Sequence, residues 1–368
     1  MEKALIYTKS LSVGYSGKVL IDGIEISVNS GEILTLIGPN GAGKSTILKT
    51  LCRQLQKISG AVYINGKESD YFRNRELAKN ISILMTGRVE PELMTCGDVV
   101  KSGRYPYTGQ LGILSENDRI IAMEAMNLTS VEELADKSFS CISDGQRQRV
   151  MLARAICQEP EILILDEPTS FLDIHHKLEL LSILKKLVYE KKIAVIMSMH
   201  EIELAQKISD YVVCISSRGI DKCGTPEEIF TSEYISRLYA ISPSSYNSDF
   251  GSVELECVKG SPDVFVIAGN GSGIRTFRRL QRMNIPFAAG VLHENDIDYS
   301  AAKSLASEII SEKPFEPVSG INIDKATKLM DSCCKVICCL ESFGTFNAGN
   351  KQLLKYAEEK GYLVNKLF

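Results

Sequence analysis

Residues 33–46 read ILTLIGPNGAGKST, and this stretch decides the fold of the first part of the chain. Its first five residues have the apolar character of a buried strand, and the segment that follows, ILKTLCRQL at 47–55, has the periodicity of a helix. A glycine-rich loop between a strand and a helix is the required context of a phosphate-binding loop. The loop residues are Gly38, Pro39, Asn40, Gly41, Ala42, Gly43, Lys44, Ser45 and Thr46.

The chemistry of this loop predicts a nucleoside triphosphate as its ligand. The glycines let backbone N–H groups curl around phosphate oxygens, where a side chain would block the approach. Lys44 is expected to reach the β- and γ-phosphates, and Ser45 offers a hydroxyl to a magnesium ion. The helix N-terminus adds its partial positive charge to the same anion. We therefore expect ATP and Mg²⁺ to bind here.

A second apolar strand ends in two carboxylates, in EILILDEPTS at 161–170. An unpaired buried charge is costly, so the two acids need a partner. Asp166 would have one if it held magnesium, directly or through water, and Glu167 would then be placed to polarise the attacking water. The alternative is a strand that ends at the surface with two solvated acids. The nearby phosphate-binding loop favours the catalytic interpretation.

Five motifs in order resemble the ATP-binding subunits of ABC transporters over residues 4–240. They are GPNGAGKST, ISDGQRQRV at 142–150, ILILDEPTS, SFLD at 170–173, and His200 after the strand IAVIMSM. The resemblance implies an α/β fold with a RecA-like core, an antiparallel β subdomain and a helical subdomain. It also implies a homodimer in which Ser143, Gly145 and Gln146 of one copy close over ATP held by the other.

The same resemblance assigns further residues to the ATP site. Tyr15, in SVGYSG, matches the position whose ring stacks on adenine, and His200 matches the histidine that contacts the γ-phosphate. With Glu167 and Lys44, His200 completes the predicted catalytic set. Each assignment has a simpler alternative: Tyr15 as a strand-end tyrosine, His200 as a structural histidine, and Ser143 as an ordinary helix N-cap.

Two residues depart from the family pattern. Thr86 stands where a glutamine usually links the magnesium site to the membrane subunit, and a threonine has a shorter reach. Asp144 stands where glycine is usual, and its charge suits a helix start but would repel ATP. We expect Asp144 to point away from the nucleotide.

The segment CGDVVKSGRYPYTG at 96–109 resembles the importer subunits for iron chelates, haem and cobalamin. This resemblance implies uptake of a metal chelate, such as a siderophore, haem or cobalamin, through separate integral membrane permease subunits fed by an external substrate-binding protein. The chain would then lie at the cytoplasmic face of the cell membrane, as a peripheral subunit. The main alternative is a soluble ABC ATPase that acts as a switch in translation or DNA repair.

Composition favours the transport hypothesis over the nucleic-acid one. Lys and Arg total 42 against 46 for Asp and Glu, so the chain lacks the broad positive charge that neutralises nucleic-acid phosphates. No segment has the roughly 18–20 apolar residues that span a bilayer, and the first ten residues lack the apolar core of a signal peptide. We expect a cytosolic chain with no nucleic-acid partner.

The C-terminal part of the chain predicts a second, smaller domain. We expect the ATP-binding domain at 1–245, a turn-rich linker at 246–258, and a Rossmann-like α/β domain at 259–368, with a regulatory or dimer-supporting role. VFVIAGNGSGIRTFRRL at 264–280 has the order strand, glycine turn, helix, which could hold a phosphate or another anion. His293, Glu294, Asp296 and Asp298 could ligate a metal, although a solvated loop is the simpler interpretation.

Overall fold

The structure is a computed structural model that describes residues 4–85, 93–109, 112–217, 219–333 and 335–364. The chain divides into two compact units, Met1–Ile229 and Phe230–Phe368. Each unit has hydrophobic core clusters of its own.

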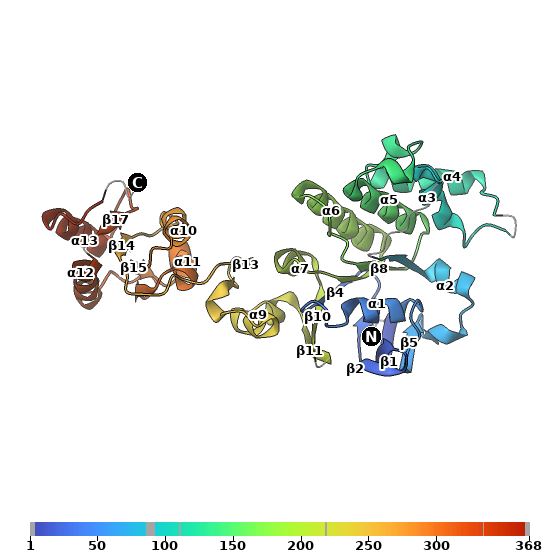
Figure 1. Cartoon of the computed structure of the whole chain (residues 1–368), viewed down its shortest axis with the longest axis horizontal. Helices are drawn as coiled ribbons and strands as arrows, with labels where there is room; N and C mark the ends of the chain where they lie inside the picture. The colour runs from blue at the N-terminus through green and yellow to red at the C-terminus, as the bar shows by residue number, and fades with distance from the viewer. Residues whose placement is uncertain (1–3, 86–92, 110–111, 218, 334, 365–368) are drawn as a thin grey trace. The chain divides into compact units, whose positions relative to one another are not determined.

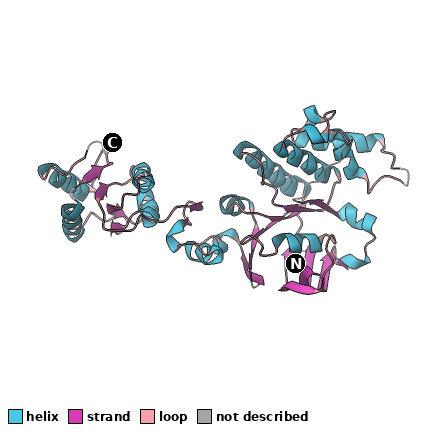
Figure 2. Cartoon of the chain, viewed as in Figure 1, coloured by secondary structure: helices cyan, strands magenta, loops and turns pink. Residues whose placement is uncertain are grey.

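A six-stranded, mostly parallel sheet forms the centre of the first unit (Figures 1 and 2). Its strand order is β11-β10-β4-β9-β8-β7, and only β11 runs antiparallel to its neighbour. Every residue of β4, β8 and β9 is buried, as expected for parallel strands covered on both faces. The strands are β4 (Ile33–Ile37), β7 (Ile81–Leu84), β8 (Ile162–Asp166), β9 (Ala194–Ser198), β10 (Tyr211–Ser216) and β11 (Gly219–Gly224).

A second, antiparallel sheet packs against the same core. Its order is β2-β1-β5-β6, with β3 paired to β1. Helix α1 (Lys44–Leu51) contacts both sheets, and its residues Ile47 and Leu51 share one core cluster with Leu11 of β1 and Ile164 of β8. The strands are β1 (Ile6–Tyr15), β2 (Lys18–Ile24), β3 (Ser27–Val28), β5 (Ser59–Ile64) and β6 (Lys67–Glu68).

The remaining helices of the first unit include a mutually packed group formed by α3 (Cys96–Lys101), α4 (Glu116–Leu128) and α5 (Asp144–Cys157). This group, the parallel sheet and the antiparallel sheet are the three parts that the sequence predicted. The other helices are α2 (Asn74–Asn80), α6 (Ile174–Lys191), α7 (Ile202–Ile208) and α8 (Pro226–Ile229). Among the described residues, no helix combines the length and the apolar character needed to cross a bilayer.

The second unit is built on a four-stranded parallel sheet of order β16-β15-β14-β17. Side chains alternate across this sheet: Val264 and Val266 share a core cluster with Phe277, whereas Phe265 shares another with Leu353. Helices therefore cover both faces, which confirms the predicted Rossmann-like α/β fold. The strands are β14 (Val264–Ile267), β15 (Phe287–His293), β16 (Glu308–Glu312) and β17 (Val336–Cys338), and the helices are α10 (Ile274–Arg282), α11 (Ile297–Leu305), α12 (Gly320–Cys333) and α13 (Ala348–Glu359).

The division between the units lies earlier than the boundary expected from the sequence. Helix α9 (Ser232–Tyr239) and the short strands β12 (Tyr246–Asn247) and β13 (Ser252–Val253) belong to the second unit. Tyr246 is buried, and the Asn247 amide donates a hydrogen bond to the backbone oxygen of Ser300 in α11, over 3.0 Å. The turn-rich composition that suggested a linker over 246–258 therefore includes residues that anchor this segment to the second unit.

Candidate functional site

The phosphate-binding loop follows β4 and leads directly into α1, as the sequence predicted. At Gly38 the backbone φ is 145°, and a Cβ there would lie 2.0 Å from the backbone oxygen of Ile215. At Gly43 the φ is 103°, and a Cβ would lie 2.7 Å from Ile21 Cδ1. Both positions therefore require glycine for the backbone path itself.

Lys44 is folded into the curve of the loop. Its Nζ donates hydrogen bonds to the backbone oxygens of Gly38 and Pro39, over 2.7 and 3.1 Å, and the residue is 5% exposed. Burial lowers the pKa of this ammonium, and the charges of Glu167 and Asp166 oppose that effect. Helix α1 begins in this loop, and no side-chain hydrogen bond caps its N-terminus. Its first N–H groups therefore remain available to a ligand at the loop. These are the features of an anion site.

Ser45, in the first turn of α1, and Asp166, the last residue of β8, meet at the carboxyl edge of the parallel sheet. The Ser45 hydroxyl donates a hydrogen bond to Asp166 Oδ1 over 3.0 Å, and Asp166 is 1% exposed. Ser198, at the end of β9, donates to the same carboxylate oxygen over 2.7 Å. The hydroxyl and the carboxylate are oxygen ligands of the kind that a hard divalent cation prefers, so this pair fits magnesium.

Glu167 lies one residue beyond β8, in a left-handed backbone conformation with φ of 48°. Its Oε1 lies 2.6 Å from His200 Nε2, and its Oε2 accepts a hydrogen bond from Ser170 over 3.2 Å. Its backbone N–H donates to the Ser198 hydroxyl over 2.9 Å. The structure thus brings together Glu167 and His200, two residues from separate strand ends.

Sequence reasoning missed Ser198 and the group around Glu201. Ser198 is a fully buried polar residue at the end of an apolar strand, which is the signal that singled out Asp166. Glu201 accepts hydrogen bonds from Thr169 and from Lys177, the latter over 2.7 Å. Burial alone would raise the pKa of Glu201, but these bonds and the Lys177 charge lower it overall. The two hydrogen bonds to Glu201 hold the backbone directly after His200 in place.

Tyr15 stands at the last position of β1, with its ring half-exposed. Its hydroxyl lies 3.2 Å from the Thr46 Oγ1, in the first turn of α1. The side chain therefore lies beside the loop, and half of the residue is open to solvent. This placement suits stacking on a base, and that role stays a prediction.

Ser143 and Gln146 form a reciprocal N-cap at the start of α5. The Gln146 N–H donates to Ser143 Oγ over 3.3 Å, and the Ser143 N–H donates to Gln146 Oε1 over 3.1 Å. Asp144 forms an ion pair with Arg147 over 2.8 Å. Gly145 is the next residue, and a Cβ added there would lie 3.5 Å from Leu172 Cδ2. In one copy this turn is an N-capped helix, and its contact with nucleotide stays a prediction.

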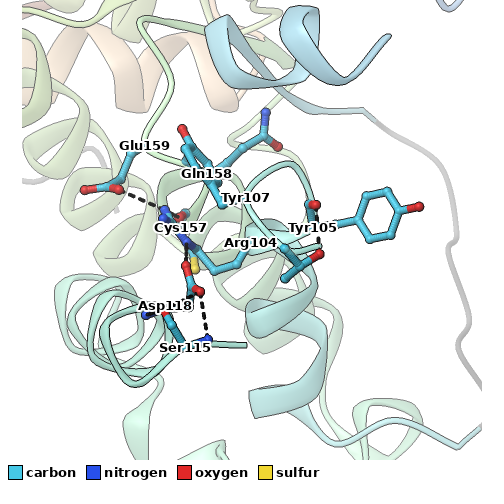
Figure 3. Close-up of polar contacts among 9 residues, drawn as sticks. Arg104, Tyr105, Tyr107, Ser115, Asp118, Cys157, Gln158 and Glu159 are labelled. Carbon is cyan, nitrogen blue, oxygen red and sulfur yellow. Dashed lines mark hydrogen bonds and ion pairs between the residues drawn. The ribbon is translucent and has the colours of Figure 1, made fainter. Parts of the chain in front are cut away.

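The predicted coupling residue, Thr86, lies outside the described residues. The nearby importer-like segment lies within them, and its arginine, Arg104, is buried. Figure 3 draws the polar contacts of this residue. Arg104 donates hydrogen bonds to Asp118, Glu159 and the backbone oxygen of Cys157, each over 2.8 Å. Its guanidinium also lies 4.0 Å from the centre of the Tyr107 ring. Arg104 therefore ties the segment after α3 to α4 and to the end of α5.

The other residues of this segment explain its pattern. A Cβ on Gly103 would lie 2.3 Å from the backbone oxygen of Arg154, so α5 leaves no room for a side chain there. The Tyr107 hydroxyl donates to the backbone oxygen of Gln158 over 3.0 Å. Tyr105 points away from this group, as Figure 3 shows, and this residue is 74% exposed. The G-R-x-P-Y pattern is thus a packing motif of the helical part, with one exposed aromatic ring.

The acidic cluster of the second unit does not have the arrangement of a metal site. Asp298 is fully buried and accepts hydrogen bonds from the backbone N–H groups of Gly273 and Ile274. Asp296 caps α11, and its Oδ2 accepts from the Asn270 N–H over 2.7 Å. Among the described residues there is no group of three potential ligands that could hold a metal ion.

The first unit is defined by a loop that curls around its own lysine and by an adjacent strand that ends in two carboxylates. That arrangement is the mark of P-loop ATPases, in which positioning and electrostatics perform phosphoryl transfer.

Comparison with known proteins gives the family within this class. The ABC transporter family model matches residues 21–170, and a model of the MJ0874 family matches residues 287–366. The chain is 42% identical over 292 residues to an uncharacterised ABC transporter ATP-binding protein of Methanocaldococcus jannaschii, which covers 78% of this chain and 100% of the relative. The chain belongs to the ATP-binding proteins of ABC transporters.

Two further similarities concern metal chelates. The chain is 38% identical over 234 residues to the iron(3+)-hydroxamate import ATP-binding protein FhuC of Bacillus subtilis, over 64% of this chain and 87% of the relative. A solved structure of a proposed metal-chelate type ABC transporter in an inward-facing conformation is similar with a TM-score of 0.57 and 26% identity, over 64% of this chain and 89% of that one. These comparisons confirm the predicted family, fold and ATPase class.

Proposed function

We propose that this chain is the ATP-hydrolysing subunit of an importer that takes up a metal chelate through separate permease subunits. The observation that carries the proposal is the cluster of Lys44, Ser45, Asp166 and Glu167 at one edge of the parallel sheet. The importer-like segment around Arg104 and the similarity to an iron(3+)-hydroxamate importer subunit support the direction and class of cargo.

In the proposed reaction the loop and Lys44 bind the β- and γ-phosphates of ATP. Lys44 would exchange its contacts with the Gly38 and Pro39 oxygens for phosphate oxygens, because a charged acceptor forms a stronger hydrogen bond. Ser45 and Asp166 would hold Mg²⁺, which neutralises phosphate charge when bound. Tyr15 would stack on the adenine ring.

Glu167 and His200 would act on the attacking water. The carboxylate of Glu167 would orient the water and accept its proton, and His200 would contact the γ-phosphate. Their 2.6 Å contact keeps both side chains at the edge of the sheet where the phosphates would lie. The Ser198 hydroxyl positions Glu167 by accepting a hydrogen bond from the backbone N–H of Glu167.

Two copies of the chain would complete each ATP site. The Ser143 hydroxyl, the Gly145 backbone and Gln146 of one copy would meet the γ-phosphate held by the other, at a helix N-terminus that favours an anion. The ion pair between Asp144 and Arg147 compensates the one acidic side chain at this turn. The dimer would lie at the cytoplasmic face of the membrane against its permease subunits, with an external binding protein as an indirect partner.

Transport by a reconstituted complex tests the proposal. The chain and its permease would be placed in vesicles with the binding protein and ATP, and uptake of ferric hydroxamate, haem and cobalamin would be compared with that of a sugar and an amino acid. We expect ATP-dependent uptake of at least one chelate. Uptake of only the sugar or the amino acid would overturn the cargo class.

A further inference from the structure

The second unit contains a cavity of 490 Å³ at the carboxyl ends of its parallel strands. Residues at the ends of β14, β15 and β17, or just beyond them, line it, including Asn270, His293 and Glu341. The chain order of the sheet reverses between β14 and β17, and ligands of open α/β sheets bind at such a switch point. A second cavity of 290 Å³ shares Asn270, His293, Asp296 and Phe346 with it. The crevice is therefore in the size range of a small-molecule site.

The glycine loop beside this cavity has no free place for phosphate at the start of α10. The buried carboxylate of Asp298 accepts from the N–H groups of Gly273 and Ile274 over 3.0 to 3.1 Å. Asp296 occupies the N–H of Asn270 over 2.7 Å. Two carboxylates from the start of α11 thus take the amide groups that would bind a pyrophosphate in a dinucleotide site. A phosphate brought here would find these amide groups occupied, and it would meet the like charge of Asp296, which lines the cavity.

The side chains that line the cavity also disfavour a negatively charged ligand. Among the described residues that line either cavity, none is lysine or arginine, whereas Asp296 and Glu341 are acidic. His293 donates its Nε2–H to the backbone oxygen of Glu316 over 2.8 Å, and in the neutral ring this leaves Nδ1 as an acceptor. The charged side chains of the lining are therefore acidic, and they suit a ligand with hydroxyl or ammonium donors.

The cavity also offers an apolar part and one buried hydroxyl. Leu340, Val291 and Phe346 line it beside the polar groups. The Ser272 hydroxyl lines it too, buried and without a hydrogen-bond partner among the described residues. An unpaired buried hydroxyl is destabilising, and a hydrogen bond to a ligand would remove that cost. A flat ring against the apolar part and a sugar against the acids would satisfy both halves.

From these observations we propose that the cavity binds a nucleoside without phosphate, neutral or positively charged at its 5′ end. The glycine loop after β14 forms one wall of the cavity. The carboxylates of Asp296 and Asp298 take up amide groups of this loop and thereby exclude nucleotides. The site is separate from the ATP site and gives the second unit a ligand of its own.

Three probes that differ only at the 5′ position test the charge preference. They are 5′-amino-5′-deoxyadenosine, which carries an ammonium, adenosine, which is neutral, and AMP, which carries a phosphate. Titration calorimetry on the full chain should show binding of the first two and an affinity for AMP at least about tenfold lower, a difference of about 1.4 kcal/mol. Failure of both phosphate-free probes to bind at millimolar concentration would overturn the proposal.

Two tryptophan variants locate the binding. Thr345 is exposed and lines the cavity, so Thr345→Trp should fill it and weaken adenosine binding at least about tenfold. Gln352→Trp places the same ring on an exposed position of α13 outside the lining and should leave binding unchanged. Adenosine binding that survives Thr345→Trp would assign it to the ATP site and refute the proposal.

A third variant tests the role of negative charge. Glu341 is exposed, and Glu341→Gln should narrow the difference in affinity between the ammonium probe and AMP. Preferential AMP binding by the wild-type chain, abolished by Thr345→Trp, would instead show a nucleotide site and would contradict the exclusion by Asp296 and Asp298.

Discussion

The side chain of Glu167 has two polar neighbours at the edge of the sheet, His200 and Ser170. Glu167→Gln keeps the size of the side chain and its ability to hydrogen-bond, but it removes the base. We expect ATP turnover to fall by about 100-fold or more, with nucleotide affinity changed only a few-fold. Steady-state phosphate release and equilibrium binding of ATP measure the two quantities.

Glu203→Gln is the matched control for this substitution. Glu203 is an exposed residue of α7, close in sequence to His200 but outside the site. It should leave turnover unchanged. Rapid hydrolysis by the Glu167→Gln variant would refute the role of Glu167 as base.

Glu312 gives a prediction for acid stability. Hydrogen bonds from the backbone N–H of Ser319 and from Asn322 lower the pKa of this carboxyl to about 2. A carboxyl whose pKa is lowered in the folded state stabilises the protein above its unfolded pKa, and the contribution is lost as the pH falls from about 4.5 toward 2. Glu312→Gln should therefore destabilise the second unit by about 1–3 kcal/mol at pH 7 and by progressively less below pH 4.5.

Chemical denaturation followed by circular dichroism, at pH 7 and at pH 3, measures this difference. Glu308→Gln, at an exposed position of the same strand, serves as control and should have little effect at either pH. An equal loss of stability at both pH values would show that the Glu312 effect is not electrostatic.

At the scale of elements, Arg104 links the turn after α3 to α4 and to the end of α5. Arg104→Met would leave Asp118, which is 7% exposed, without its buried cation. Removing one partner of a buried ion pair is costly, so we expect the first unit to lose about 3 kcal/mol of stability. The hydrogen bond from the Ser115 hydroxyl also holds the pKa of Asp118 below its ordinary value. In the variant this hydroxyl would still donate to the carboxylate. Thermal unfolding measures the loss.

Arg119→Met provides the comparison on the same helix. Arg119 forms an exposed ion pair with Glu116 over 3.8 Å, and such pairs contribute less than about 1 kcal/mol. ATP binding should persist in both variants, because neither residue contacts the phosphate-binding loop. Equal stability of the two variants would show that the G-R-x-P-Y segment is not a packing motif.

At the scale of the whole molecule, the division after Ile229 predicts where the chain can be shortened. A chain that ends at Ile229 keeps every predicted ATP-site residue and should bind ATP with unchanged affinity. A chain that ends at residue 258 retains Tyr246, which is 1% exposed in the full chain, without the helix α11 that it packs near. Its exposed aromatic surface should cause aggregation.

Size-exclusion chromatography and binding of a hydrophobic dye compare the two shortened chains. The chain ending at 258 should bind more dye and elute earlier. Identical behaviour would place the boundary nearer 245, as the turn-rich composition suggested, and would refute the earlier division.

The sequence alone determined the local features of the ATP site. The strand, loop and helix around Lys44, and the strand ending in Asp166 and Glu167, were predictable because each depends on residues close together in the chain. The same holds for the strand and glycine turn that begin the Rossmann-like domain. Periodicity and turn composition report such local structure directly.

Only the tertiary structure decided which distant groups meet. Ser198 bonds to Asp166, Tyr246 packs within the second unit, and Asp298 occupies the amide groups of a loop that resembles a phosphate site. A loop pattern states which backbone groups are available, but the partners that reach them come from other strands and helices. The physical reason is that hydrogen bonding and burial are satisfied across the fold, and sequence spacing does not encode those distances.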